Sequence, residues 1–428
     1  MTGFPDGVKL HAADTYVAGG VFYARAMSHP CRTLNANNAD LFFVPAFTDR
    51  VAPRICADAV VMKNSTSHHS CSRNILYERL EAAAPGALTA RNGSDHWLLV
   101  PRHGYAYDLA VSYELRLTDR RLGSAIRFSM EEGKVDYPWP GPRTRPMFRS
   151  TPFASFIHAE ASTPWGSLPW RTSSYERRRD VLVAVAFNAV HTAKGTINTA
   201  GPAVSQLNQQ RDRLYRSCEG AANLSICTIL PLSPTKTQVR GYHMRTLGSI
   251  AALYWRSTFC LQPIGDACTR KATIDALLLG CIPVLFHPCQ KLQWPWHWGG
   301  WLDAATVYFE NASAVDVVQE LRRIPLKRIL QMQHTIAMHA HCLHYHQPTI
   351  AREPARLLAD SSSGSADLSR VGDADDAFEI TLKGSWLVAR HKQGEIPANE
   401  LAARSSKLCK SVPLEQKSTS TRGRASRM

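Results

Sequence analysis

Short apolar runs recur along the chain and are separated by longer stretches with helical periodicity. Five runs are rich in β-branched and aromatic residues and have the length of strands: 41–44, 97–100, 181–187, 258–261 and 282–286. Helices are expected at 75–84, 211–221, 244–255 and 314–323. Because the two patterns alternate, the sequence predicts an α/β protein with largely parallel sheets. The Pro-rich stretch 137–169 is expected to carry the chain between two halves.

The segment 257–286 has the strongest local signature, a strand, a turn, a helix and a second strand. Gly265 in the turn can adopt positive φ, and Thr269 is expected to cap the helix. One apolar stripe follows at Ile274, Leu277, Leu278 and Cys281. Because a helix start presents unpaired N–H groups and partial positive charge, this turn predicts a phosphate-binding site.

Two charged side chains extend this prediction to a nucleotide. Arg270 lies in line with the apolar stripe, so its guanidinium is expected to face an anion rather than open water. Asp275, one turn further on, can accept a hydrogen bond from a ribose hydroxyl. The candidate nucleotide-binding residues are therefore Gly265, Asp266, Thr269, Arg270 and Asp275. The alternative is an ordinary βαβ unit with an exposed arginine and an exposed aspartate.

The same segment resembles the signature of the exostosin family of glycosyltransferases, of the plant and algal type. That signature runs S-x-F-C-L-x-P-x-G, then T-R, then D-A or E-A, then G-C-I-P-V, and STFCLQPIGDACTRKATIDALLLGCIPVLF is similar to it. Other similar stretches follow in the family's order: CRT at 31–33, NADLFFVPAF at 38–47, GSDHWLLVP at 93–101, RDVLVAVAF at 179–187 and RDRLYRSC at 211–218. The resemblance covers residues 20–345.

The resemblance implies a GT-B fold, in which two Rossmann-like domains face a cleft. Residues 1–19 would be an N-terminal extension, 20–175 the acceptor-side domain and 176–345 the nucleotide-sugar-binding domain. Residues 346–428 are expected to form a variable, largely disordered basic tail. The implied activity is transfer of a sugar from a UDP-sugar to a hydroxyl of a polysaccharide or glycoprotein, with inversion. No metal and no tightly bound cofactor are expected, and association into homo- or hetero-oligomers with related transferases is implied.

Inversion requires a base that deprotonates the acceptor hydroxyl. Asp95 and His96 are the candidate catalytic residues because they precede a strand of the acceptor-side half. A structural contact between these two side chains is the alternative interpretation.

One departure from the family pattern supports a second function. Asn188 and Ala189 follow the strand at 181–187, where the family places a glycine against the donor. A non-catalytic protein that keeps the fold and binds polyanions or glycans is therefore the alternative, although retention of Thr269, Arg270 and Asp275 argues against it. No interleaved basic and aromatic motif is present in the folded part, so nucleic acid is not an expected partner.

The net charge is +15, and it has two sources. Residues 401–428 carry seven basic side chains against one acid, which leaves an excess of about nine charges on the remainder. That remainder can steer acidic polymers or nucleotide sugars to the protein, or serve solubility alone. The sequence shows no signal peptide and no segment of bilayer-spanning length, whereas the resemblance implies a Golgi lumen or membrane location.

Cysteine, histidine and tryptophan provide the remaining candidates. Eleven cysteines without a C-x-x-C pair disfavour a zinc ribbon. Cys56 with Cys71 and Cys218 with Cys227 are close enough to bridge, whereas Cys260 and Cys281 are expected to be buried and free. The histidines at 334, 339, 341, 344 and 346 form either a metal site or a polar helix end. The tryptophans at 294, 296, 298 and 301 either stack on a sugar or pack between the two halves.

Overall fold

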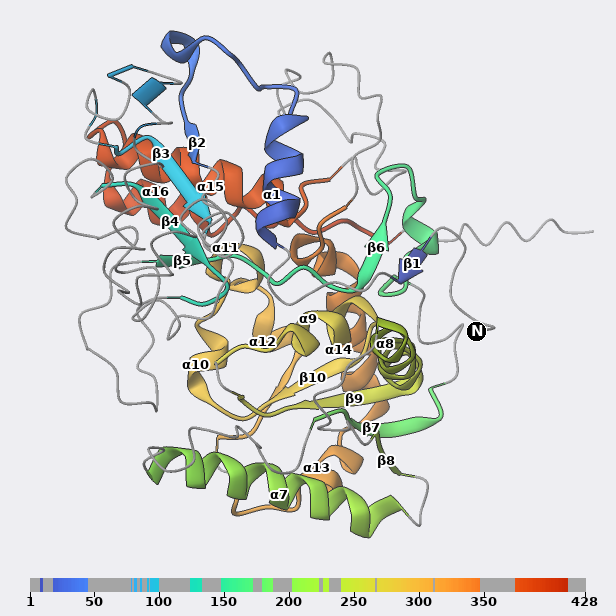
Figure 1. The fold of residues 1–428 in the computed structure, drawn as a ribbon. Coiled ribbons are helices and arrows are strands. Elements are labelled where there is room, and N and C mark those ends of the chain that lie inside the picture. Colours follow the sequence, from blue (N-terminus) through green and yellow to red (C-terminus); the bar gives the residue numbers. More distant parts are fainter. Residues whose placement is uncertain are drawn as a thin grey trace, which may run out of the picture.

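The computed structural model describes residues 8–10, 18–44, 78, 81–82, 85–86, 91, 93–99, 124–132, 148–171, 179–187, 202–222, 226–230, 240–265, 268–310, 312–346 and 374–414. Within them, two parallel sheets occupy the upper and lower parts of the molecule in the view of Figure 1. The predicted α/β class with parallel sheets is therefore confirmed.

The first sheet has the strand order β2-β3-β4-β5, and all of its strands are parallel. Its strands are β2 (Phe42–Val44), β3 (His96–Leu99), β4 (Ile126–Ser129) and β5 (Phe148–Ser150). Helix α1 (Ala18–Met27) precedes it, followed by a 3-10 turn at Ala36–Asn38. A separate antiparallel pair joins β1 (Val8–Leu10) to β6 (Ile157–Ala159), and a 3-10 turn follows at Trp165–Ser167.

The second sheet has the order β11-β10-β9-β7-β8, again with parallel pairs. Its strands are β7 (Val181–Val185), β8 (Cys227–Ile229), β9 (Ser257–Gln262), β10 (Ile282–Leu285) and β11 (Val307–Tyr308). All six residues of β9 are buried because β7 and β10 flank it on both sides. This central position explains why its sequence is a continuous apolar run rather than an alternating one.

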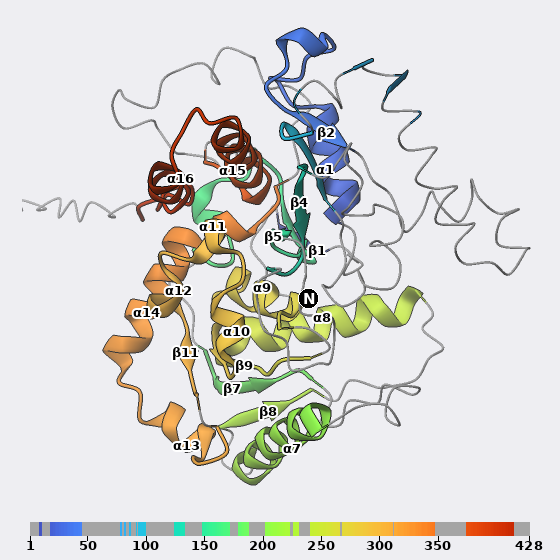
Figure 2. The same ribbon diagram turned by 90° about the vertical axis from the view of Figure 1, so that its left-hand side faces the viewer.

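Helices of different lengths separate and follow the strands of the second sheet along the chain. They are α7 (Pro202–Ala222), α8 (Arg240–Arg256), α9 (Lys271–Leu278), α10 (Pro288–Lys291), α11 (Pro295–Trp298), α12 (Leu302–Ala305), α13 (Val317–Arg322) and α14 (Leu326–His339), with a 3-10 turn at Ala340–Leu343. Figures 1 and 2 agree that α7 lies at the end of the molecule farthest from β2, whereas α9 lies toward the first sheet.

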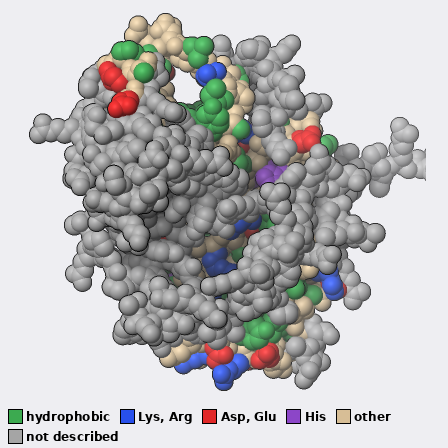
Figure 3. All heavy atoms as spheres, in the orientation of Figure 1, with side chains coloured by type: hydrophobic (Ala, Val, Ile, Leu, Met, Phe, Trp, Pro, Cys, Tyr) green, Lys and Arg blue, Asp and Glu red, His purple; other side chains and the backbone are tan. Residues whose placement is uncertain are grey.

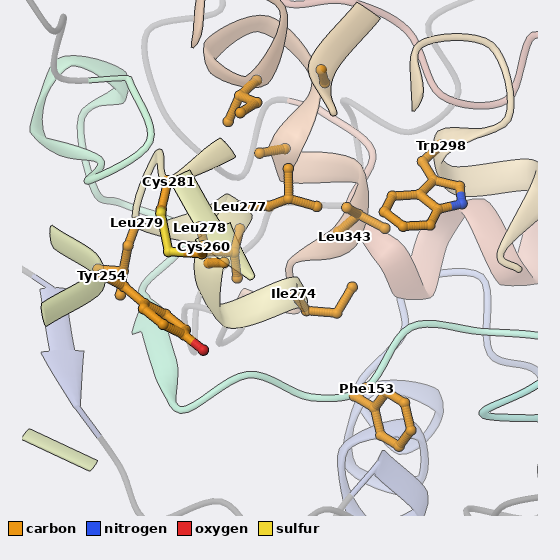
Figure 4. Packing of buried hydrophobic residues seen from close by; sticks show 14 of the residues in the cluster. Phe153, Tyr254, Cys260, Ile274, Leu277, Leu278, Leu279, Cys281, Trp298 and Leu343 are labelled. Atoms are coloured by element: carbon orange, nitrogen blue, oxygen red, sulfur yellow. A yellow bond between two sulfur atoms is a disulfide. The ribbon is translucent and has the colours of Figure 1, made fainter. Parts of the chain in front are cut away.

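Helix α9 anchors the core between the two sheets. Its predicted stripe is confirmed, since Ile274, Leu277 and Leu278 are fully buried. These side chains pack near the disulfide between Cys260 and Cys281 (Figure 4). The helix ends because Gly280 adopts φ 66°, a left-handed conformation that glycine tolerates without strain.

The C-terminal part of the chain corrects one expectation. Instead of a largely disordered tail from residue 346, the chain forms α15 (Ala377–Lys392) and α16 (Ala398–Ser405) beside the first sheet (Figure 1). Phe378 of α15 packs edge-on against Phe22 of α1, with ring centroids 5.3 Å apart. A disulfide from Cys342 to Cys409 also holds this segment to the body of the protein. Residues 361–376 and 401–428 have the composition of solvated segments, and they obscure the amphipathic helix that lies between them.

Most of the predicted elements in the described regions are observed, with shifted ends. The predicted helices 211–221 and 244–255 are parts of α7 and α8, and the predicted helix 314–323 contains α13. Most of the expected helix at 75–84 lies outside the described residues. The stretch 137–169 is not simply a connector, since β5 and β6 lie within it. Among the described residues, no helix has both the length and the apolar character that a bilayer crossing requires.

Helix α15 packs so closely against the tryptophan-rich segment 294–301 that position 384 requires a glycine. A Cβ added at Gly384 would overlap the indole ring of the buried Trp296. We therefore expect Gly384→Ala to lower the free energy of unfolding by about 1–3 kcal/mol, measured by urea denaturation. Gly220→Ala is the matched control, because Gly220 is also helical and has no neighbour within 4 Å of an added Cβ. The control is expected to stabilise the protein by about 0.5–1 kcal/mol, and equal losses in the two variants would contradict the packing argument.

Candidate functional site

The predicted nucleotide site lies between the end of β9 and the start of α9. β9 ends at Gln262, and α9 begins at Lys271. In the intervening turn, Gly265 lies against Arg211, since an added Cβ would lie 3.5 Å from its Nη2 atom. That distance is an ordinary contact, so the turn does not strictly require glycine at 265. Asp266 lies outside the described residues.

The helix start differs from the prediction in one respect. Arg270, not Thr269, is the N-cap residue of α9, and its side chain makes no capping hydrogen bond. Thr269 lies one position earlier and points toward Glu131. Its N–H and its hydroxyl lie 3.3 Å and 3.5 Å from Oε1 of Glu131, which follows β4 in the first sheet. A carboxylate therefore lies beside the helix start that was predicted to bind phosphate.

Two guanidinium groups converge beside this helix start. Arg270 is half-buried, and its Nη2 atom donates to the carbonyl of Ala186 over 3.4 Å. Arg211 of α7 is 5% exposed, and its Nε atom donates to the carbonyl of Ile264 over 3.2 Å. Both guanidinium carbons lie 5.8 Å from the ring centroid of Phe187. The carboxyl end of β7 is thus flanked by two positive charges.

Arg211 is the functional candidate that sequence reasoning missed. Its signal was present, because Arg211 opens the R-x-x-L-x-x-x-C helix that supported the family resemblance. Figure 3 shows Lys and Arg side chains on the described surface near the middle of one face, between its upper and lower parts.

The carboxyl ends of the two sheets meet through the segment that follows α10. Gln293 Oε1 accepts a hydrogen bond of 2.7 Å from the N–H of Glu132. The backbone N–H of Trp294 donates to Ser150 Oγ over 2.8 Å, and its indole N–H donates to the carbonyl of Met130 over 3.1 Å. Trp294 has φ 48°, which is uncommon for a bulky residue and persists where surrounding contacts determine the backbone.

This geometry resolves the alternatives for the tryptophans. The side chains of Trp294, Trp296, Trp298 and Trp301 are 0%, 6%, 1% and 5% exposed, respectively. An indole ring must present an open face to stack on a sugar. Packing between the two halves of the molecule is therefore the role that the structure supports.

Asp275 is buried and engaged by protein groups. Its Oδ1 atom accepts hydrogen bonds from Ser155 Oγ at 2.6 Å and from the N–H of Phe156 at 3.3 Å. The ammonium group of Lys271 lies 3.1 Å and 3.0 Å from its two oxygens. Burial raises the pKa of Asp275, whereas Lys271 and Ser155 lower it, and burial outweighs them. The contacts with Ser155 and Phe156 connect α9 to the segment between β5 and β6, so a role with ribose remains a prediction.

The structure places Asp95 and His96 away from the other candidates. His96 is the first residue of β3, so both lie at the amino end of the first sheet. Ligands of parallel sheets bind at the carboxyl ends of the strands, where Glu131 and Thr269 meet. Oδ1 of Asp95 lies 2.8 Å from Nδ1 of His96, whose ring stacks on Phe42. These contacts favour the structural interpretation of the pair.

One group of side chains has the composition of a metal site. Potential ligand atoms of Cys268, His287 and Cys289 lie within 4.8 Å of one another. The two sulfur atoms, however, form a disulfide with each other, whereas metal ligation by cysteine requires thiolates. The group is therefore interpreted as a covalent link rather than a metal centre.

The histidines near the end of α14 are also structural. Burial lowers the pKa of His341 and of His344 to about 3, so both rings are neutral at ordinary pH. The ring of His341 packs edge-on against Trp165, and His344 Nε2 accepts a hydrogen bond of 3.3 Å from the N–H of Ala159. These contacts support the polar helix end rather than a metal site.

Four disulfides lie within the described residues. The expected bridge between Cys218 and Cys227 is confirmed, whereas the expectation that Cys260 and Cys281 are free is wrong, because they pair. The sequence did not predict this pair because Cys260 lies in β9 and Cys281 follows α9. The two residues become neighbours only when β9 pairs with β10. Cys56 and Cys71 lie outside the described residues.

Known proteins share sequence similarity with most of the chain. A family model described as the exostosin GT47 domain matches residues 8–312. The chain is 25% identical over 347 residues to a probable xyloglucan galactosyltransferase, GT17, of Arabidopsis thaliana, covering 77% of this chain and 67% of that protein. It is 23% identical over 284 residues to GT19, also described as a probable xyloglucan galactosyltransferase, covering 65% of this chain and 58% of that protein. It is 24% identical over 287 residues to xyloglucan-specific galacturonosyltransferase 1, covering 65% of this chain and 36% of that protein. GT19 and this galacturonosyltransferase are also from Arabidopsis thaliana.

Proposed function

The chain belongs to the exostosin GT47 family, and we propose that it is a glycosyltransferase that moves a sugar from a UDP-sugar to a glycan hydroxyl with inversion. The observation that carries the proposal is the position of Arg211 and Arg270. Both guanidinium groups lie beside Phe187 at the carboxyl end of β7, close to the start of α9. Two guanidinium groups and a helix start form a strong electrostatic site for a diphosphate.

In the proposed reaction, the bond between the anomeric carbon and the diphosphate oxygen breaks while negative charge grows on the leaving group. Arg211 and Arg270 stabilise that charge and require no proton transfer. Because both also contact backbone carbonyls at Ala186 and Ile264, they are held in place before the donor arrives. Because the negative charge grows as the diphosphate leaves, these contacts stabilise the transition state more than the bound donor.

Inversion requires a base on the acceptor side of the donor. Glu131 follows a strand of the first sheet and contacts Thr269 at the start of α9. Unlike Asp95 and His96, it lies at the carboxyl edge of the sheet, but its contact with Thr269 puts it beside the proposed leaving group rather than on the acceptor side, so it is not assigned as the base. In a GT-B arrangement, the half with β2–β5 would hold the acceptor and the half with β7–β11 the donor.

The substrates follow from the relatives. Because the matched Arabidopsis proteins are described as galactosyl- and galacturonosyltransferases acting on xyloglucan, we infer UDP-galactose or UDP-galacturonic acid as donor and a xyloglucan-type glycan as acceptor. The four disulfides support an oxidising compartment such as the Golgi lumen.

The proposal is tested by incubating the protein with each of these donors and with xyloglucan oligosaccharides. We expect a product with a β-linked sugar from the α-linked UDP donor, read from the anomeric proton coupling by NMR. Calorimetric titration with UDP is expected to show binding. Absence of UDP binding together with tight heparin binding would instead support the non-catalytic polyanion-binding alternative.

A further inference from the structure

A disulfide lies directly beside the proposed donor site. It joins Cys268, the residue before Thr269, to Cys289, the second residue of α10, with a Cα–Cα distance of 5.8 Å. Both cysteines are almost fully buried, with 1% and 2% exposure. Cys268 follows the carboxyl end of β9 and Cys289 follows the carboxyl end of β10, so the bridge crosses the edge of the sheet at which donors bind.

The Cys289 end of the bridge is held firmly. The side chain of His287 accepts a hydrogen bond of 3.2 Å from the N–H of Cys289. Gln290 Oε1 accepts from the N–H groups of Phe286 and His287, at 2.8 Å and 3.0 Å. Its Nε2 atom donates to the carbonyl of Gln262 over 2.8 Å, which ties the turn to the end of β9.

The Cys268 end is held less firmly. The contacts of Thr269 with Glu131 are long, at 3.3 Å and 3.5 Å, and the side chain of Arg270, which reaches the carbonyl of Ala186 over 3.4 Å, makes no capping bond to the backbone of its own helix. A covalent link to the better-held turn therefore limits the positions that the backbone at 268–270 can take.

We propose that Cys268 and Cys289 are positioning residues for the donor, and that their disulfide holds Thr269 and Arg270 in the geometry that receives the diphosphate. The proposal rests on the proposed function, since it concerns binding of a UDP-sugar. The cysteines do not touch the donor in this account; they act through Arg270 and the start of α9. Without the bridge, part of the binding energy is spent on ordering the turn, which weakens binding.

The chain contains a matched control for this bridge. Cys260 and Cys281 are also buried, and their disulfide has the same sequence separation of 21 residues. Equal loop lengths predict similar effects on the unfolded chain. The control bridge, however, joins the middle of β9 to the residue before β10, away from the carboxyl ends of both strands.

The test compares Cys268→Ala/Cys289→Ala with Cys260→Ala/Cys281→Ala. We expect similar losses in melting temperature for the two double variants. The Kd for UDP, measured by calorimetry, should rise about tenfold for Cys268→Ala/Cys289→Ala and less than twofold for the control. An unchanged Kd in the first variant, or an equal rise in both, would overturn the inference while leaving the proposed function intact. Absence of UDP binding by the unmodified protein would overturn both.

Kinetics supply a second measurement that general loss of structure would not reproduce. In Cys268→Ala/Cys289→Ala, the KM for the UDP-sugar should rise while the KM for the acceptor stays constant. If the control variant does not fold, hydrogen exchange on Cys268→Ala/Cys289→Ala decides: the amides of Thr269 and Lys271 should exchange faster than in the unmodified protein, and unchanged protection would overturn the inference.

Discussion

Arg270→Ala is expected to lower kcat for sugar transfer by about 100- to 1,000-fold, the range seen when one preorganised donor to a developing negative charge is removed. Arg270 is the N-cap residue of α9 and lies beside Phe187, so its charge adds to that of the helix start. Arg211 remains in the variant but cannot replace the fork at the helix start. Initial rates at saturating UDP-sugar and acceptor measure the effect.

Two companion variants define the cause. Arg270→Lys keeps the charge but loses the planar fork, and we expect an intermediate loss of kcat. Arg213→Ala removes one positive charge from an exposed position on α7, and we expect less than a twofold change. If Arg270→Ala retained more than a tenth of the kcat, or if Arg213→Ala lost as much, the electrostatic role of Arg270 would be wrong.

Arg25→Ala is expected to lower the free energy of unfolding by about 3–5 kcal/mol, because it leaves buried carboxylates without their partner. Arg25 is 5% exposed. Its guanidinium donates to Asp376 at 2.7 Å, to Glu379 at 3.0 Å and to the carbonyl of His346 at 2.9 Å. Through these bonds, α1 near the N-terminus fixes the start of α15.

Urea denaturation measures this loss, and Arg404→Ala provides the control. Arg404 pairs with Glu400 on the exposed surface of α16, where an ion pair contributes about 0–1 kcal/mol. Similar losses in Arg25→Ala and Arg404→Ala would contradict the role given to burial.

The same cluster of Arg25, Asp376 and Glu379 should also affect how stability changes in acid. Burial raises the pKa of Asp376, but His346 and Arg25 lower it more, so the pKa lies below its ordinary value. The folded carboxylate then binds protons less readily than the unfolded one, and its contribution to stability is complete above pH about 4 and is lost as the pH falls further. In Arg25→Ala the pKa moves back toward its ordinary value, so the loss of stability below pH 4 should be shallower than in the unmodified protein.

Buried histidines also lower stability in acid, and they do so equally in the unmodified protein and in Arg25→Ala. Burial lowers the pKa of three histidines to about 3: His297, His341 and His344. The unfolded chain takes up these protons near pH 6.5, whereas the folded chain does not, so stability declines from about pH 6.5 downward in both proteins. The comparison between them therefore isolates the Arg25 cluster.

Local sequence was sufficient where one element determines its own pattern. The buried run of β9 and the stripe of Ile274, Leu277 and Leu278 on α9 require only a strand period and a helix period, and both were predicted. The structure of the C-terminal part was not predicted, because Arg25 and Asp376 are 351 residues apart and neither sequence position identifies the other. A run of acidic and small residues looks solvated until a buried partner is known.

The residues of the candidate site also differ in whether local sequence identifies them. The turn around Thr269 and Arg270 was predicted from its own letters, whereas Arg211 approaches it from a helix some fifty residues earlier in the chain. Asp95 and His96 were selected because they precede a strand, but in a parallel sheet that position is the amino end, whereas ligands bind at the carboxyl end.

The two disulfides around α9 also have a consequence for oxidative folding. Cys260 pairs with Cys281 and Cys268 with Cys289, so the two cross-links interleave along the chain. Nearest-neighbour pairing, 260 with 268 and 281 with 289, would close shorter loops and so form faster in an unstructured chain. We therefore expect recovery from the reduced, denatured protein to involve exchange of wrong bridges, and a disulfide isomerase should accelerate it.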